Sequence, residues 1–420
     1  MRSLVLALLA IALLAPSAFA QDESDEPRGK ANFPPSADGF GPTSVPYDLA
    51  EADEFKEPLI RFAAFDRALK PWFDFKGRLS TRHGFQFGAD WHGLYQHIDG
   101  APVEDEALSG IFRVFGEWKL LNRCKPLCTG SLIWKVEYRD TIGTDVAPGS
   151  IGFVNGYAGI PGTLFSDFGW ALTNLYWKQK FANGRGTFIV GQLDATDYLD
   201  VIGIANPFTM FSNLSVLVNP AMVLPNQGLG AAASWRFQNN SYVIVGVNDA
   251  NALPTRDGFQ TFEEGETFKF VEYGFACPGV RHFLDNIHLT VWHQDRLEKL
   301  GVPEAWGWSL SGTRSFQDDQ LVGAFRVGWS SDAAPISERH FSTMWAYRVR
   351  KRGDVVGFGA AWDRVWGQAQ GNQLSTELFW RLVIAENIQL TPSVQWLRNP
   401  AFAPTEKDYW AFGLRFRLTL

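Results

Sequence analysis

From about residue 83 to the end of the chain, apolar and polar side chains alternate with a period of two. In "SLIWKVEYR", residues 131–139, one face carries Leu, Trp, Val and Tyr, and the other carries Ile, Lys, Glu and Arg. The stretches "IFRVFGEWKL", "FSTMWAYRVR" and "IQLTPSVQW" repeat this arrangement. Successive side chains of a β-strand point to opposite faces of the sheet, so the pattern predicts strands with one apolar and one polar face.

Sixteen such segments can be placed along the chain, and short and long connections alternate between them. "AEN", "KRG" and "FQDDQ" are short, whereas 140–169, 195–228 and 248–266 are long. An even number of strands with short turns at one end and long loops at the other is typical of an outer-membrane β-barrel. The predicted strands start near residues 83, 111, 131, 170, 186, 229, 241, 267, 286, 306, 321, 341, 354, 376, 387 and 410.

A soluble β-sandwich or propeller would also show alternation, but it does not explain the aromatic residues. Trp and Phe fall near the strand ends, where the aromatic girdles of membrane barrels lie. The closing stretch "WAFGLRFRLTL" places Trp410, Phe412 and Leu414 on one face and Arg415 and Arg417 on the other. We therefore predict an all-β fold, a transmembrane antiparallel barrel whose last strand turns its apolar face to lipid.

Two segments precede the predicted barrel, which spans residues 81–420. Residues 1–20 combine Arg2, an apolar stretch and the ending "SAFA", which is the pattern of a cleaved secretory signal peptide. Residues 21–80 begin acidic and rich in Pro and Gly, so we expect a flexible periplasmic leader. One short helix could form in it, with Leu59, Phe62 and Phe65 on one side.

Composition narrows the class of protein further. The chain has 38 Lys and Arg against 45 Asp and Glu, a balance that argues against a nucleic-acid partner. Cys124 and Cys128 are close enough for a possible disulfide across a turn, and a metal site is the alternative, although no further ligands are near. Cys277 stands alone.

The predicted inner face carries a mixture of arginines, carboxylates and amides. A channel for anions would favour basic rings alone, whereas mixed donors and acceptors suit a neutral solute covered in hydroxyl groups. Alternatively, the opposite charges only neutralise each other across a wet lumen. The candidate pore-lining residues are Arg113, Glu117, Glu137, Arg139, Gln192, Asp194, Arg236, Arg326, Arg348, Glu377, Arg381, Gln395 and Arg415, with Arg350 and Arg417 on the same face.

Residues 195–228 form a long connection that is unusually apolar for a surface loop. Three prolines stiffen it, and its Phe, Leu and Val content predicts that it packs inside the barrel and narrows the lumen. Its aromatic side chains either stack on sugar rings or simply pack on one another.

Three stretches resemble the carbohydrate-selective porins of the OprB type. They are "LYWKQKFANGRGTFIVGQLDATDYL", "VLPNQGLGAAASWRF" and "ELFWRLVIAENIQLTPSVQWLRNPAF". The resemblance implies a sixteen-stranded outer-membrane channel for monosaccharides such as glucose, with a narrow waist. By the same resemblance Gln192, Asp194, Glu377, Arg381 and Gln395 would belong to that waist. The terminal Leu420, where an aromatic residue is usual, and the Cys124/Cys128 pair depart from the family pattern.

No enzyme motif is convincing in this sequence. It has neither Gly-x-Ser-x-Gly nor His-Glu-x-x-His, and "GFGAAW" at 357–362 lies in a strand pattern with no helix after it. We therefore expect a passive sugar porin without cofactor in the outer membrane of a Gram-negative bacterium, and the alternative is a general or anion-preferring porin. Expected partners are a carbohydrate solute, outer-membrane lipid and lipopolysaccharide, the barrel-assembly machinery and possibly further copies of the chain.

Overall fold

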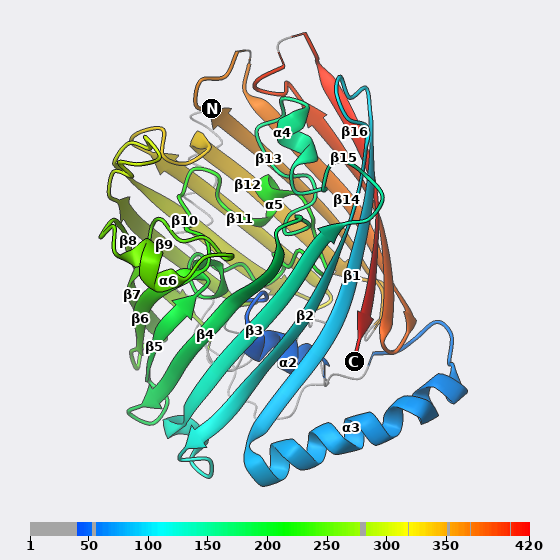
Figure 1. Cartoon of the computed structure of the whole chain (residues 1–420), viewed down its shortest axis with the longest axis vertical. Coiled ribbons are helices and arrows are strands. Elements are labelled where there is room, and N and C mark those ends of the chain that lie inside the picture. Colours follow the sequence, from blue (N-terminus) through cyan, green and yellow to red (C-terminus); the bar gives the residue numbers. More distant parts are fainter. Residues whose placement is uncertain are drawn as a thin grey trace.

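The computed structural model describes residues 40–52, 56–277, 283–317, 319–350, 353–369, 371–403 and 405–420. The predicted signal peptide, residues 1–20, therefore lies outside the described residues. The strands, labelled as in Figure 1, are β1 Phe85–Asp99, β2 Glu106–Leu121, β3 Gly130–Thr141, β4 Gly169–Phe181, β5 Gly186–Leu193, β6 Gly228–Arg236, β7 Ser241–Asp249, β8 Thr267–Ala276, β9 Asn286–Gln294, β10 Ala305–Phe316, β11 Leu321–Ser330, β12 Ser337–Arg348, β13 Val355–Val365, β14 Gln373–Ala385, β15 Ile388–Arg398 and β16 Asp408–Thr419.

These sixteen strands form one closed antiparallel barrel, so the predicted fold class is confirmed. Each strand pairs with its neighbours in sequence, and β1 closes the barrel on β16 with Leu94 opposite Arg415. The largest differences from the predicted starts are at β2, which begins at Glu106, and β12, which begins at Ser337. In both strands small or polar residues precede the aromatic ones, which is why the apolar pattern alone placed the start too late.

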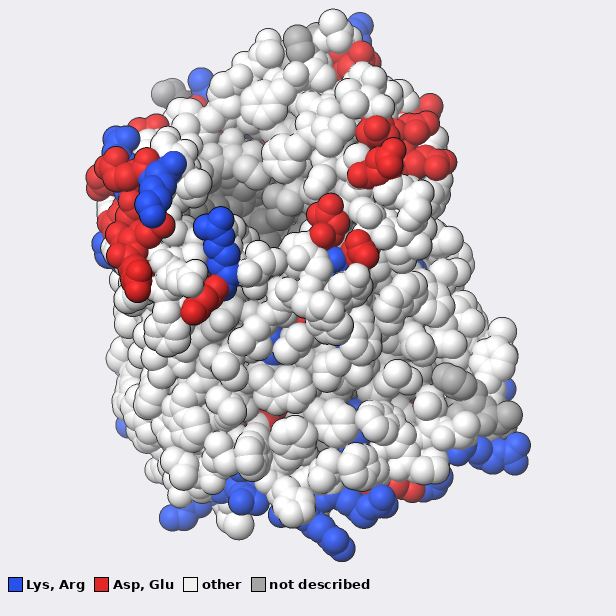
Figure 2. Space-filling model, in the orientation of Figure 1, with Lys and Arg blue, Asp and Glu red and all other residues white. Residues whose placement is uncertain are grey.

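The two faces of the barrel wall differ as the alternation requires. On β16, Trp410, Phe412 and Leu414 are exposed on the outer side, whereas Arg415 and Arg417 are buried inside. Figure 2 shows that the middle of one outer face is almost free of charged side chains. On that face, Asp and Glu gather at the end that carries the long loops, and Lys and Arg gather at the end with the short turns. A band without charge between two charged rims matches the hydrocarbon layer of a bilayer.

The helices occupy the ends and the interior of the barrel. They are α2 Val45–Ala52, α3 Ala63–His83, η1 Pro126–Cys128, α4 Ile151–Val154, η2 Ala195–Asp197, α5 Leu214–Leu217 and α6 Gly258–Phe262. The sequence suggested one short helix between residues 47 and 72; the structure has α2 and α3 there, with Leu59 and Phe62 between them. In the described part of the chain, no helix has the length and apolar character needed to cross a membrane.

The possible disulfide between Cys124 and Cys128 is not formed in this structure. Cys124 and Cys128 are free thiols, and Cys128 is the last residue of the single turn η1. Within the described ranges, no group of three or more His, Cys, Asp or Glu side chains is placed to hold a metal ion.

Candidate functional site: the interior of the barrel

Residues 40–52 lie inside the barrel, although the sequence suggested a periplasmic leader over 21–80. Figure 1 shows α2 within the lumen, in the half near the short turns. Phe40, Val45 and Leu49 are buried in one apolar cluster with side chains of the inner wall, such as Phe115. The amide N–H of Gly41 donates to the carbonyl of Asp197 at 2.6 Å, which joins this segment to the loop between β5 and β6. We call residues 40–52 the lumen segment.

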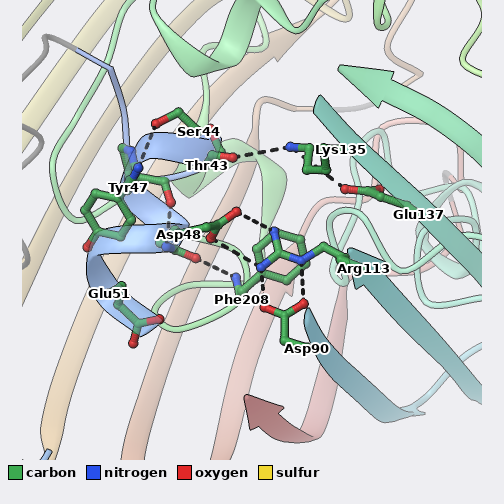
Figure 3. Close-up of polar contacts among 12 residues, drawn as sticks. Thr43, Ser44, Tyr47, Asp48, Glu51, Asp90, Arg113, Lys135, Glu137 and Phe208 are labelled. Carbon is green, nitrogen blue, oxygen red and sulfur yellow. Dashed lines mark hydrogen bonds and ion pairs between the residues drawn. The ribbon is translucent and has the colours of Figure 1, made fainter. Parts of the chain in front are cut away.

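Arg113 of β2 is the centre of a buried charge cluster that holds the lumen segment (Figure 3). Its Nη1 and Nη2 atoms donate to the Asp48 carboxylate of α2 at 3.0 and 3.2 Å. Its Nε and Nη2 atoms donate to Asp90 of β1 at 2.8 and 2.5 Å. The guanidinium also lies 3.8 Å from the ring centre of Phe208, a cation–π contact with the β5–β6 loop. One side chain thus joins the wall, the lumen segment and the loop.

Glu51 forms the second anchor of the lumen segment. Its carboxylate pairs with Arg417 of β16 at 2.5 Å and with Lys56 at 3.0 Å. Burial raises the pKa of Asp48 to about 6, with the Arg113 charge opposing the shift. Burial acts to raise the pKa of Glu51 as well. The charges and hydrogen bonds of Arg417 and Lys56 together outweigh this effect and hold the pKa of Glu51 well below its usual value. The two carboxyl groups of one short helix therefore have opposite electrostatic environments.

The loop 195–228 packs into the lumen against an apolar part of the wall. Ile202, Phe211 and Leu217 are buried in one cluster with side chains of β11 to β14, such as Met344. The ring of Phe211 meets Phe379 of β14 edge-on, with the ring centres 4.9 Å apart. Burial of this apolar surface explains why a long connection rich in Phe, Leu and Val folds inward rather than into solvent.

Polar side chains of the wall fix the backbone of the same loop. The Glu377 carboxylate accepts hydrogen bonds from the amide N–H and hydroxyl of Ser212 and from the amide N–H of Asn213, at 2.8–2.9 Å. Gln395 donates to the Ser212 hydroxyl at 3.0 Å and accepts from Asn213 at 2.9 Å. Arg415 donates to the carbonyls of Pro207 and Met210. The side chains of Glu377, Gln395 and Arg415 therefore bind the loop 195–228 and do not face an open, water-filled lumen.

Arg326 of β11 holds the loop at two further points. Its Nη2 and Nη1 atoms donate to the carbonyls of Asp200 and Leu217 at 2.7 and 2.9 Å, and its Nε pairs with the Asp200 carboxylate at 2.8 Å. Burial acts to raise the pKa of Asp200, but the Arg326 charge and the interactions with His288 and Ser311 together outweigh it and lower that pKa to about 2.

A cavity of about 410 Å³ remains between the loop, the lumen segment and the wall of β3. Pro42 and Thr43 of the lumen segment line part of it, and Phe208 supplies an aromatic surface. Its polar lining comes from Lys135, Glu137, Arg139, Thr163, Asp194, Thr196, Asp200, Asn219, Asn226, Gln227 and Arg326, together with Thr43. Cations, carboxylates and amides thus line part of one small space, and apolar side chains, mainly of the loop 195–228, line the rest.

Several of these lining groups are linked to one another. The Lys135 ammonium donates to the Thr43 carbonyl at 3.4 Å, and Arg139 pairs with Glu137. Asp194, which lies just beyond the end of β5, accepts a hydrogen bond from Gln227 at 2.6 Å. Burial raises the pKa of the neighbouring Asp197 carboxyl to about 7, although the Lys135 charge opposes this.

The remaining candidate residues lie in other parts of the barrel. Glu117 pairs with Lys178 inside the wall at 3.0 Å. Arg236 and Arg348 are the last residues of β6 and β12, at the end with short turns. Arg381 of β14 is buried and donates to the Gly353 carbonyl at 3.5 Å.

Gln192 is a correction to the list of pore-lining residues. It lies on the same side of β5 as Phe188 and Val190, which are exposed on the outer face, and it donates to the Leu172 carbonyl. Gln192 and Asp194 share a parity in the sequence, and both were assigned to the inner face. Strand β5 stops at Leu193, so Asp194 turns inward as part of the loop while Gln192 keeps the outward parity of the strand.

Sequence reasoning missed the carboxylates that neutralise the arginines. Asp48, Glu51, Asp90 and Asp200 all pair with inner-wall arginines and are absent from the candidate list. One signal was present: Asp48 and Glu51 are three residues apart, which places them on one face of a helix. An inner wall rich in Arg also requires counter-charges, which had to come from another segment.

A closed sixteen-stranded barrel with an inward-folded loop and a polar interior defines a porin. Similar solved structures agree with this class. The high-pH structure of Pseudomonas putida OprB superposes with a TM-score of 0.68 at 14% identity, over 83% of this chain and 97% of that one. The low-pH structure of the same protein superposes with a TM-score of 0.51 at 12% identity, over 83% of this chain and 96% of that one. A mutant of the Rh. blastica porin superposes with a TM-score of 0.52 at 12% identity, over 80% of this chain and 100% of that one.

The sequence identifies the family within that class. The chain belongs to the carbohydrate-selective porin, OprB family, whose model matches residues 138–344 and 304–420. No protein among those with curated functions matches the chain. Membership makes the chain a channel of the Gram-negative outer membrane rather than an enzyme.

Proposed function

We propose that this channel carries monosaccharides such as glucose down their gradient, through the cavity beside β3. The observation that supports the proposal is the lining of that cavity, in which Lys135, Glu137 and Arg139 face Asp194 and Gln227. Each hydroxyl of a sugar both donates and accepts hydrogen bonds, so it finds partners among cations, carboxylates and amides alike. The volume of about 410 Å³ falls within the range of about 300–1,000 Å³ for small-molecule sites.

The charge pairing inside the barrel favours a neutral solute over an anion. Arg113, Arg326 and Arg417 each contact a buried carboxylate, so their positive charge is largely compensated where it lies. An anion would have to compete with these carboxylates. A sugar can exchange single hydrogen bonds along the wall and leave again, which suits passive transport by weak binding.

The cavity is closed on one side by the lumen segment, and this shapes the proposed pathway. Pro42 and Thr43 line the cavity, and α2, which begins two residues later, lies in the half of the barrel near the short turns (Figure 1). We infer that the loop 195–228 and the lumen segment together form the waist. Displacement of the lumen segment would widen the exit to the periplasm.

Conductance measurements with purified protein in planar bilayers test the proposal. Added glucose should reduce the current, and the reversal potential in a salt gradient should show weak ion selectivity. In Lys135→Gln, the glucose concentration for half-block should rise about tenfold, since hydrogen bonds to charged groups are worth about 1.5–3 kcal/mol. Lys269→Gln is the matched control, because Lys269 pairs with Asp295 in an exposed position outside the cavity.

Two results would overturn the proposal. Strong anion selectivity without glucose block would identify a porin for anionic solutes. Equal half-block concentrations in Lys135→Gln, Lys269→Gln and the parent protein would exclude the cavity beside β3 as the sugar site.

A further inference from the structure

Helix α3 is amphipathic from residue 67 to residue 82. Ala68, Trp72, Phe75 and Leu79 follow one another at spacings of four, three and four residues, which places them on one face. The other face carries mainly charged side chains, with cations in excess, namely Arg67, Lys70, Asp74, Arg78 and Arg82.

One edge of the apolar face fixes the helix to the barrel rim. Trp72 meets Phe87 of β1 edge-on, with ring centres 5.4 Å apart. The Lys76 ammonium donates to the main-chain oxygen of Leu420 at 3.1 Å and lies over the rings of Phe73 and Phe87. The helix is therefore held at the level of the aromatic side chains that begin β1, at the end with short turns.

The described residues leave the remaining apolar surface uncovered. Phe75 is 42% exposed, and Leu59, Ile60 and Phe62 in the segment before the helix are 52%, 50% and 44% exposed. That segment is fixed as well, because the amide groups of Leu59 and Ile60 donate to the carbonyls of Val383 and Ile384 on β14. Four large apolar side chains thus point outward from one rim of the barrel.

The position of the helix indicates what covers this surface. In Figure 1, α3 runs along the end of the barrel and projects past its wall, where the bilayer surface would lie. Figure 2 shows Lys and Arg side chains along the same end. A helix with aromatic side chains on one face and Lys and Arg on the other is suited to lie in the plane of a membrane interface, and cations attract anionic lipid headgroups.

We propose that α3 lies flat on the periplasmic leaflet of the outer membrane, with Leu59, Ile60, Phe62 and Phe75 inserted among the acyl chains. Its basic face contacts anionic phospholipid headgroups. The helix thereby binds lipid outside the barrel and fixes the point at which the chain enters the lumen.

Two adjacent residues of α3 provide a matched test. Phe75 and the Asp74 side chain are similarly exposed in the protein, at 42% and 48%, but they lie on the apolar and the polar face. The full-length protein, with its three cysteines replaced by serine, is prepared as Phe75→Cys and as Asp74→Cys and spin-labelled. Each variant is reconstituted in phosphatidylcholine vesicles with and without phosphatidylglycerol. Collision rates with oxygen and with a water-soluble nickel complex are then compared, and heat-modifiable migration confirms a folded barrel.

The ratio of oxygen to nickel collisions should be several-fold higher at position 75 than at 74, and phosphatidylglycerol should widen the difference. Equal ratios at the two positions would place the helix in water and overturn the proposal. A high ratio at 75 that appears only at high protein-to-lipid ratio, together with dipolar broadening between labels, would show that a second copy of the chain covers this face. Block of the current by sugar is measured in a different assay, so the proposed sugar transport and the proposed membrane contact of α3 can each be refuted independently.

Discussion

The two carboxyl groups of α2 predict opposite responses when each is neutralised. Glu51→Gln keeps the side-chain volume but removes the charge that pairs with Arg417 and Lys56. Breaking a buried ion pair at one partner costs about 3–5 kcal/mol. Arg417 keeps a second carboxylate, Asp90, at 3.6 Å, so the lower end of that range applies. A loss of about 3 kcal/mol shifts the balance between docked and released lumen segment by roughly 150-fold.

The burial of Val45, Tyr47 and Leu49 is unchanged in this variant, so the segment remains docked most of the time. The expected result in single-channel recordings at pH 7 is therefore more frequent openings to a larger conductance. Asp48→Asn is the control, because its site raises the pKa of that carboxyl to about 6 and so favours the neutral form. At pH 7 this variant should stay as closed as the parent. If Glu51→Gln shows the same openings as the parent, the lumen segment does not limit the current.

Three further outcomes follow from the contacts of the interior. Because the pKa of docked Asp48 lies above its usual value of 3.8, protonation favours the docked state, so conductance should fall from pH 7 to pH 5 and Asp48→Asn should abolish that fall. Below about pH 4.5, protonation of Glu51, whose docked pKa is lowered, should reverse the trend, and a monotonic pH profile would contradict the assignment. Glu377→Ala leaves the amide groups of Ser212 and Asn213 without acceptors and should lower the free energy of unfolding by about 2–4 kcal/mol, measured by urea titration, with noisier open currents. Phe379→Ala, which removes the contact with the loop, should cost about 3–5 kcal/mol in the same titration, and a loss below 1 kcal/mol would mean that the loop is not packed as described.

The barrel could be predicted from the sequence because each strand shows a local pattern of apolar and polar residues. Alternation, aromatic residues at strand ends and the lengths of connections are each visible in short continuous stretches of the sequence. The alternation pattern does not predict the side on which a residue lies once the strand has ended. Gln192 and Asp194 share a parity in the sequence but lie on different sides of the barrel wall, because β5 ends between them.

The contents of the lumen could be predicted only in part. The apolar character of 195–228 indicated an inward position, and the cluster around Phe211 shows that position. The contact partners were beyond reach, since Glu51 pairs with Arg417 and Glu377 binds Ser212 across long stretches of chain. A short acidic segment is predicted to be a solvent-exposed leader when only its own sequence is considered. Its position in the lumen can be predicted only when the buried arginines that pair with its carboxylates are known.

The pairing of Glu51 with Arg417 also bears on the order in which the molecule is assembled. Arg417 belongs to the last strand, and Asp90, which both Arg417 and Arg113 contact, belongs to the first. The charge of Arg417 is therefore fully balanced only after β1 and β16 have met, because until then Arg417 and Asp90 lie on opposite edges of an open sheet. Seam closure and docking of the lumen segment thus each supply one carboxylate to Arg417, so a barrel that has not finished closing leaves this arginine without one of its two partners.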